Sequence, residues 1–469
     1  MNNKNEQVNQ AAGQGKITIE NETQVDRKGI FGWMLFDWSA QPFHTLIITF
    51  IFAPYFASAV VTTDGVPDPV KGQEWWGYAA GIGGLFIAFL SPILGALSDA
   101  TGPRKPWIFG FSILAIAGVW SLWFVTPGAD NSLVMFGLAA FVVALIGFEF
   151  AAVFNNAMMP SLVSREKMGA LSGNAWALGY CGGLMVLVFV LLFLASNPET
   201  GKTFVGFDPI FGLDPDEREG DRAVGPITAM WYLLFVIPLF LFTPDSAKRA
   251  RVAGAVHRGL SELLSTLKSL PQEKSLFSFL GASMLYRDAL NGLFIFGGIY
   301  AGGVLGWTSI HLATFGILAS IAGIFGCVLG GWADNRIGTK KVVVISIYLL
   351  MIACTILIST GPDEVFFTSL AAGSSLPDLV FYAGGCLVGA AGGALQAASR
   401  PLLVDQAKPG KMGEAFGLYA LSGRATAFIA PFSIAYVTGL FDNQRVGITP
   451  VLLLFALGLL LLIPVRSRD

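Results

Sequence analysis

Long apolar runs recur along the whole chain and limit what it can fold into. Twelve mostly apolar segments, separated by polar stretches, account for most of the 469 residues. A helix of about 20 residues crosses the ~30 Å hydrocarbon core of a bilayer, because each residue adds about 1.5 Å. Charged residues make up only 13% of the sequence, whereas soluble domains carry about 25%. We therefore expect an all-α polytopic membrane protein with twelve transmembrane helices.

The twelve expected helices form two groups of six. Their ranges are 31–58, 75–97, 106–126, 133–157, 169–195 and 224–243 in the first group, and 276–304, 308–330, 341–359, 379–399, 414–439 and 447–464 in the second. The expected domains are a tail (1–29), a first six-helix bundle (30–243), a linker (244–275) and a second six-helix bundle (276–469). The linker mixes Lys and Arg with leucines, which predicts an amphipathic helix on the membrane surface.

The distribution of positive charge predicts the orientation. The tail, the linker, the C-terminus and the loops on their side hold 22 of the 29 Lys and Arg residues, and the opposite loops hold five. Cytoplasmic loops are enriched in these residues. We therefore expect a multi-pass protein of the inner (plasma) membrane with both termini in the cytoplasm. The acidic loop 196–223 on the other side is expected to be a solvated surface loop.

A short charged loop occurs once in each half. The first copy, 95–105, joins spans two and three, and the second, 330–341, joins spans eight and nine. Each combines glycines with an Asp and basic residues, a pattern that suits close helix packing and contacts at helix ends. It resembles the loop of the major facilitator superfamily. The residues that we predict to act in gating are Asp99, Arg104, Lys105, Asp334 and Arg336.

The two halves are also related by an internal repeat. Leu-Ser-Gly-Asn-Ala begins at Leu171, and Leu-Ser-Gly-Arg-Ala begins at Leu421. Asp37 in span one and Asp288 in span seven are separated by a similar interval. Two parallel six-helix repeats predict an alternating-access transporter with its site between the halves, near mid-membrane.

Further motifs indicate one particular family within this superfamily. They are Phe36-Asp37-Trp38, the segments 155–162 and 169–180, Tyr286-Arg287-Asp288, the segment 396–400 and the segment 416–419. Together they resemble the "unknown major facilitator" family, the bacterial relatives of the fungal autophagy-related vacuole effluxers, from about residue 30 onward. The fungal relatives are amino-acid effluxers, so the resemblance implies an amino-acid-like substrate. One departure is Arg287-Asp288-Ala289, where the resemblance predicts Asn-Asp-Gly.

Polar residues inside the spans mark a candidate translocation path. An Asp, Lys or Arg at bilayer depth costs roughly 2.5–3.5 kcal/mol, so each needs a partner or a cavity. The resemblance implies that spans one, four, seven and eleven, which carry these residues, line the central cavity. The candidate substrate-binding or coupling residues are Asp37, Gln41, Glu149, Asn156, Asn174, Arg287, Asp288, Asn291 and Arg424.

Each candidate also has a structural interpretation. Asp37 lies near a helix start, where it can touch water, and Arg287 and Asp288 can form a structural ion pair. Arg424 lies near the bilayer midplane, where it needs either Asp288 or a substrate carboxylate as a partner. Arg400 lies near the cytoplasmic end of its helix, and we expect it to reach the membrane surface. Glu149 has no cation beside it in the sequence, which favours a functional role.

The sequence predicts a secondary transporter of a small polar or zwitterionic metabolite, coupled to a proton or sodium gradient. One alternative is a sugar–cation symporter of the same superfamily, which the segment from Asp99 to Trp107 also resembles. Another is a non-transporting membrane receptor or scaffold. No His-Glu-x-x-His, Walker lysine or nucleophile elbow is present, so we expect no enzyme, no catalytic residue, no cofactor and no metal site. The expected partners are membrane lipids, a small-molecule substrate and a coupling cation, with no nucleic acid, and the expected state is a monomer.

Overall fold

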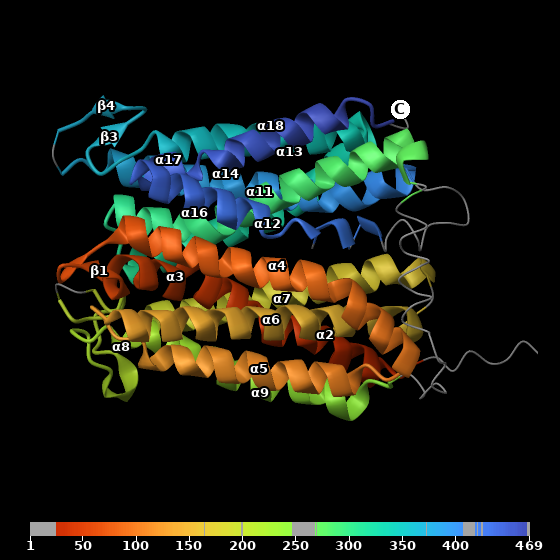
Figure 1. The fold of residues 1–469 in the computed structure, drawn as a ribbon, viewed down its shortest axis with the longest axis horizontal. Coiled ribbons are helices and arrows are strands. Elements are labelled where there is room, and N and C mark those ends of the chain that lie inside the picture. The colour runs from red at the N-terminus through yellow and green to blue at the C-terminus, as the bar shows by residue number, and fades with distance from the viewer. Residues whose placement is uncertain are drawn as a thin grey trace, which may run out of the picture.

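The computed structural model describes residues 25–163, 165–197, 200–245, 268, 270–371, 373–406, 418–419, 421–423 and 425–466. Two groups of long, roughly parallel helices lie side by side (Figure 1). The first group contains α2 (Arg27–Pro42), η1 (Phe43–Phe50), α3 (Phe52–Tyr55), η2 (Phe56–Val60), α4 (Pro69–Thr101), α5 (Lys105–Ser121), η3 (Leu122–Phe124), α6 (Asn131–Leu162), α7 (Arg165–Phe193), η4 (Ile210–Gly212), α8 (Glu219–Arg222) and α9 (Val224–Phe242). The second group contains η5 (Leu270–Gln272), α11 (Lys274–Val304), α12 (Ser309–Ile337), α13 (Thr339–Ile358), α14 (Leu376–Gln406), α16 (Ile429–Phe441), α17 (Gln444–Ile448) and α18 (Pro450–Leu462).

The helices confirm the predicted class of an all-α polytopic membrane protein. Among the described residues, nine helical segments are long and apolar enough to cross a membrane. Two further helices, α4 and α11, are 33 and 31 residues long. In the expected range of span eleven the structure describes a shorter apolar helix, α16, of 13 residues. The expected domain boundary stays a prediction, because most of the linker 244–275 lies outside the described residues.

Two small hairpins, absent from the expected elements, mark one end of the bundle. In the first half β1 (Thr62–Thr63) pairs antiparallel with β2 (Val66–Pro67), and in the second β3 (Glu364–Val365) pairs with β4 (Thr368–Ser369). Both hairpins and α8 lie at the same end in Figure 1, which we call the hairpin end. The C-terminus lies at the opposite end, which we call the terminus end.

The first span is not a regular α-helix. After Pro42 the backbone continues as a π-helix, and a break at Ile51 precedes the short α3 and a second π-turn. Proline lacks the N–H that a regular helix uses, and π-turns often occur near functional sites. The irregular segment contacts α11, and Gly298 there packs so closely against the Thr49 carbonyl and Pro54 that no larger side chain fits.

Close contacts between helices depend on small residues. On α5, a Cβ added to Gly118 would lie 2.6 Å from the Ala144 backbone nitrogen of α6. In a membrane, helix association relies on such backbone proximity, because lipid tails are as apolar as the helices. A larger side chain at this position must therefore push α5 and α6 apart.

Gly118→Val is expected to destabilise the first half by about 1–3 kcal/mol, the usual cost of overpacking. The measurement is the thermal midpoint of the detergent-purified protein, followed by size-exclusion chromatography. Gly110→Val on the same helix is the matched control, because an added Cβ there meets no atom within 4 Å. Equal midpoints for the two variants would contradict the close-packing explanation.

The acidic loop 196–223 differs from its prediction. Asp221 is only 4% exposed, because it pairs with Arg218 and with Ser309 of the other half. The prediction of a solvated loop is therefore wrong for Asp221, although Asp208 remains exposed beside Lys202.

Candidate functional site

Asp37 of α2 is half-buried and lies beside Gly179 of α7. Its carboxylate interacts electrostatically with Arg400 of α14. The neighbouring helix α7 leaves room beside Asp37, since a Cβ added to Gly179 would lie 3.4 Å from the Asp37 Cβ. One candidate residue of the first half is therefore within electrostatic range of a cation of the second.

Arg400 belongs to a larger group of polar side chains. It also interacts electrostatically with Arg287 and Tyr419. The Arg287 guanidinium lies 4.4 Å from the centre of the Tyr419 ring, and its Nη1 donates to the Tyr419 carbonyl oxygen at 3.2 Å. We call Asp37, Arg287, Arg400 and Tyr419 the charged cluster. Arg400 is itself exposed, as expected for a cation near the end of its helix, and its electrostatic neighbours come from distant spans that the sequence alone does not bring together.

Asp288 points away from this cluster, although it follows Arg287 in the chain. Its Oδ2 accepts a hydrogen bond from the Ala430 backbone N–H at 2.8 Å. Its Oδ1 is buried and has no hydrogen-bond partner among the described residues. Arg287 and Asp288 bond to different partners, and none of the described ion pairs joins them, so the structure does not support the structural-pair interpretation.

The Asp288 contact falls where span eleven is broken. Residues 426–428 form a turn, and α16 begins directly after it. The first N–H groups of a helix lack partners within the helix, and a carboxylate satisfies and stabilises them. Gly84 of α4 packs on the same turn, since a Cβ there would lie 3.1 Å from the Ala427 carbonyl oxygen. Asp288 therefore holds a segment that contacts the other half.

Glu149 of α6 is half-buried and has a neighbour that sequence spacing did not reveal. It interacts electrostatically with His44 of η1, so a titratable nitrogen lies near its carboxylate. The sequence around Glu149 therefore did not reveal its electrostatic neighbour, because His44 belongs to a different span.

The other candidate residues are less closely grouped. Gln41 is half-buried against Gly183 of α7. Asn156, Asn174 and Asn291 are exposed, and in the described part of the chain none bonds to another candidate. Arg424 lies outside the described residues. The sequence also missed Asn155, which is 1% exposed and accepts from Trp33 Nε1 through its carbonyl oxygen at 2.7 Å.

The first charged loop makes contacts within its own half. The backbone N–H groups of Arg104 and Lys105 donate to the two Asp245 carboxylate oxygens at 2.8 and 3.0 Å. The Lys105 ammonium donates to the Phe240 carbonyl oxygen at 2.9 Å. These bonds tie the start of span three to the end of span six. The side chain of Asp99 lies outside the described residues.

The second charged loop repeats the arrangement. The Lys340 ammonium donates to the carbonyl oxygens of Ile463 and Val465, at 3.1 and 2.7 Å, after span twelve. The Asp334 carbonyl accepts from the Gly338 N–H at 3.1 Å, and Arg336 lies over the Trp332 ring at 4.1 Å. Gating by Asp334 and Arg336 stays a prediction.

The glycines of the two loops have a common role. Gly102 and Gly338 have φ angles of 93° and 89°, which residues with a Cβ rarely adopt. Each glycine lets the chain turn sharply between two membrane helices. This turn explains why the pattern recurs in both halves.

Comparisons with known proteins agree with this architecture. The family model described as "Vacuole effluxer Atg22 like" matches residues 75–468. An uncharacterized MFS-type transporter of Bacillus subtilis, YxiO, is 24% identical over 433 residues, which are 92% of this chain and 93% of that protein. Autophagy-related protein 22 of Cryptococcus neoformans is 23% identical over 310 residues, and the match spans 50% of its length.

A solved structure shows the same fold. A bacterial homologue of the iron transporter ferroportin, in an inward-facing state, superposes with a TM-score of 0.59 and 16% identity. The match covers 93% of this chain and 98% of that one. With two groups of long helices and a family match over most of its length, this multi-pass membrane transporter of the major facilitator type belongs to the Atg22-like vacuole effluxer family.

Proposed function

We propose that the chain moves a small zwitterionic, amino-acid-like metabolite across the membrane by alternating access between its two halves. The charged cluster carries this proposal, because Asp37 of one half lies within electrostatic range of Arg400 of the other. A zwitterion offers a carboxylate to the guanidinium groups and an ammonium group to Asp37. One small molecule can thereby contact both halves.

The charges of the cluster favour a ligand with a carboxylate. The described members include two guanidinium groups and one carboxylate. Arginine stays protonated at bilayer depth and binds carboxylates through two parallel hydrogen bonds. The Tyr419 ring fixes the plane of the Arg287 guanidinium, which reduces the ordering that a bound carboxylate must impose. Asp37 would orient the opposite end of the ligand.

The transport step is coupled, in this proposal, to a proton or sodium gradient, with Asp288 or Glu149 as the coupling group. Asp288 supports the proton alternative, because its unbonded Oδ1 can carry a proton while Oδ2 keeps its hydrogen bond. The distribution of Lys and Arg supports a plasma-membrane location with the terminus end facing the cytoplasm. A monomer contains both halves of the site and suffices for the mechanism.

Ligand-induced stabilisation of the purified protein tests the substrate class. Amino acids are expected to raise the thermal midpoint, whereas sugars and simple organic acids are not, because only a zwitterion satisfies both sides of the cluster. Arg400→Ala should remove this stabilisation. Arg336→Ala is the matched control, since Arg336 is an exposed arginine that lies over Trp332.

The other outcomes separate the alternatives. Stabilisation by sugars alone would favour a sugar–cation symporter. Stabilisation by amino acids without uptake or exchange in vesicles would favour a receptor. Equal stabilisation of the unmutated protein and Arg400→Ala by amino acids would contradict the proposed site.

A further inference from the structure

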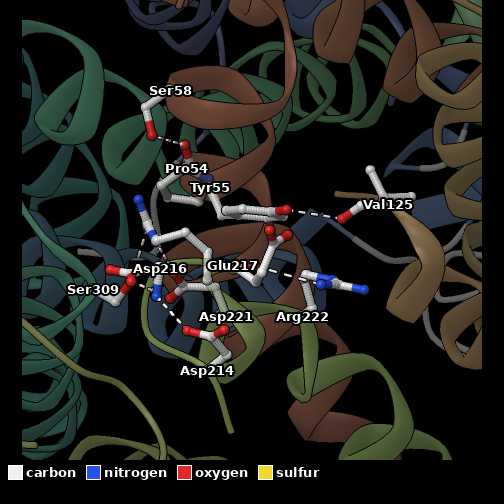
Figure 2. Close-up of polar contacts among 11 residues, drawn as sticks. Pro54, Tyr55, Ser58, Val125, Asp214, Asp216, Glu217, Asp221, Arg222 and Ser309 are labelled. Atoms are coloured by element: carbon white, nitrogen blue, oxygen red, sulfur yellow. Dashed lines mark hydrogen bonds and ion pairs between the residues drawn. The ribbon is translucent and has the colours of Figure 1, made fainter. Parts of the chain in front are cut away.

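A buried polar group at the hairpin end joins the two halves. Asp221 of α8 is 4% exposed and Ser309, the first residue of α12, is 3% exposed. The Ser309 hydroxyl donates to Asp221 Oδ1 (Figure 2). Arg218 Nε donates to Asp221 Oδ2 at 2.5 Å. Arg218 Nη2 also donates to Ser309 Oγ at 3.5 Å. The carboxylate therefore bonds to one side chain from each half.

Arg218 and Arg222 are fixed by several contacts within the first half. The Arg218 guanidinium lies 5.5 Å from the centre of the Tyr55 ring, and the Tyr55 hydroxyl donates to the Val125 carbonyl oxygen at 2.8 Å. Arg222 Nε donates to the Trp123 carbonyl oxygen at 2.9 Å. These contacts connect α8 with the first span and with the segment after α5. Asp221 and Arg218 must therefore move with the first half.

The backbone of Arg218 adopts an unfavourable conformation where its side chain pairs with Asp221. Its φ of 52° is left-handed, a conformation that costs energy for a residue with a Cβ. Burial by itself lowers the pKa of the Arg218 guanidinium, but the charge and hydrogen bond of Asp221 raise it above its ordinary value. The Arg218 guanidinium is therefore paired with the Asp221 carboxylate within the first half.

Hydrogen bonds between uncharged groups also join the two halves at the hairpin end. Gln73 Nε2 of α4 donates to Thr438 Oγ1 of α16 at 2.9 Å, and Gln444 Nε2 of α17 donates to the Pro69 carbonyl oxygen at 2.7 Å. These bonds also cross between the halves and are buried. Among the described hydrogen bonds that join the halves at this end, the Asp221–Ser309 bond differs in having a carboxylate acceptor, and bonds to a carboxylate are roughly twice as strong as neutral ones.

We propose that Arg218, Asp221 and Ser309 form a bolt that keeps the hairpin end closed, and that this end opens when Ser309 separates from Asp221. The inference rests on the alternating access proposed above. It adds that the Ser309–Asp221 hydrogen bond must break before the hairpin end can open. Arg218 remains with Asp221 during opening, so the buried carboxylate keeps its cation. The bolt thus sets the population of the state that opens toward the hairpin side.

Distance measurements between spin labels test the bolt without any substrate. Labels are placed at Asp64→Cys in the β1–β2 turn and at Ser375→Cys before α14, both on exposed residues of different halves, after the four native cysteines are replaced by alanine. In proteoliposomes, Ser309→Ala is expected to raise the population of longer distances several-fold over the unmutated background. Ser309→Thr, which keeps the hydroxyl, should restore the short distances.

Thr308→Ala is the matched control. Its hydroxyl bonds to His311 Nδ1 of the same helix at 2.9 Å and does not reach the other half. We expect its distance distribution to match that of the unmutated background. An unchanged distribution in folded Ser309→Ala, or an equal shift in Thr308→Ala, would overturn the bolt. The uptake and stabilisation experiments on the charged cluster are unaffected by either result, so the two proposals fail separately.

Discussion

Asp288→Asn is expected to abolish accumulation of substrate against a gradient while substrate exchange continues. The asparagine Oδ1 can still accept the Ala430 N–H bond, so the cap on α16 and the fold are preserved. The asparagine cannot gain or lose a proton, so a cycle that loads a proton at this buried position cannot be completed. Accumulation and exchange of labelled substrate are measured in the same proteoliposomes, with and without an imposed proton gradient.

Glu149→Gln is the companion variant, because Glu149 is the other candidate coupling residue and has His44 as a neighbour. If Asp288 is the coupling group, Glu149→Gln retains gradient-driven accumulation. Unchanged pH dependence of accumulation in Asp288→Asn would exclude Asp288 from this role. Dependence on a sodium gradient alone would replace the proton with sodium as the coupling ion.

Arg287→Ala is expected to weaken substrate binding roughly 10- to 100-fold. A hydrogen bond to a charged group contributes about 1.5–3 kcal/mol, and each ~1.4 kcal/mol is a factor of ten in affinity. The variant loses the guanidinium over the Tyr419 ring and its bond to the Tyr419 carbonyl. The measurement is the dissociation constant from thermal-shift titration with the stabilising amino acid.

Tyr419→Phe is the control for this variant. It keeps the ring beneath Arg287 and the backbone carbonyl that accepts the hydrogen bond, so binding should stay within a few-fold of the unmutated value. Arg287→Lys keeps the positive charge but loses the planar fork, and it should bind with intermediate affinity. Full affinity in folded Arg287→Ala would show that Arg287 only supports the structure.

Properties that depend on short stretches of sequence were predictable. Apolar runs of membrane-spanning length determine the all-α membrane class, because backbone polar groups in lipid must be satisfied within a helix. The charged loops were recognisable because Gly102 and Gly338 provide the same left-handed turn in both halves. The change of the first span from α-helix to π-helix after Pro42 also has a local cause, the missing N–H of proline.

Which charges meet was decided only by the tertiary structure. Arg287 and Asp288 are adjacent in sequence, yet one lies on the Tyr419 ring and the other caps α16, because successive residues of a helix point in different directions. Arg400 comes within electrostatic range of Asp37, and Ser309 bonds to Asp221, only because the two halves lie side by side. The sequence alone determined that these charges needed partners, and the packing of distant spans decided which partners they found.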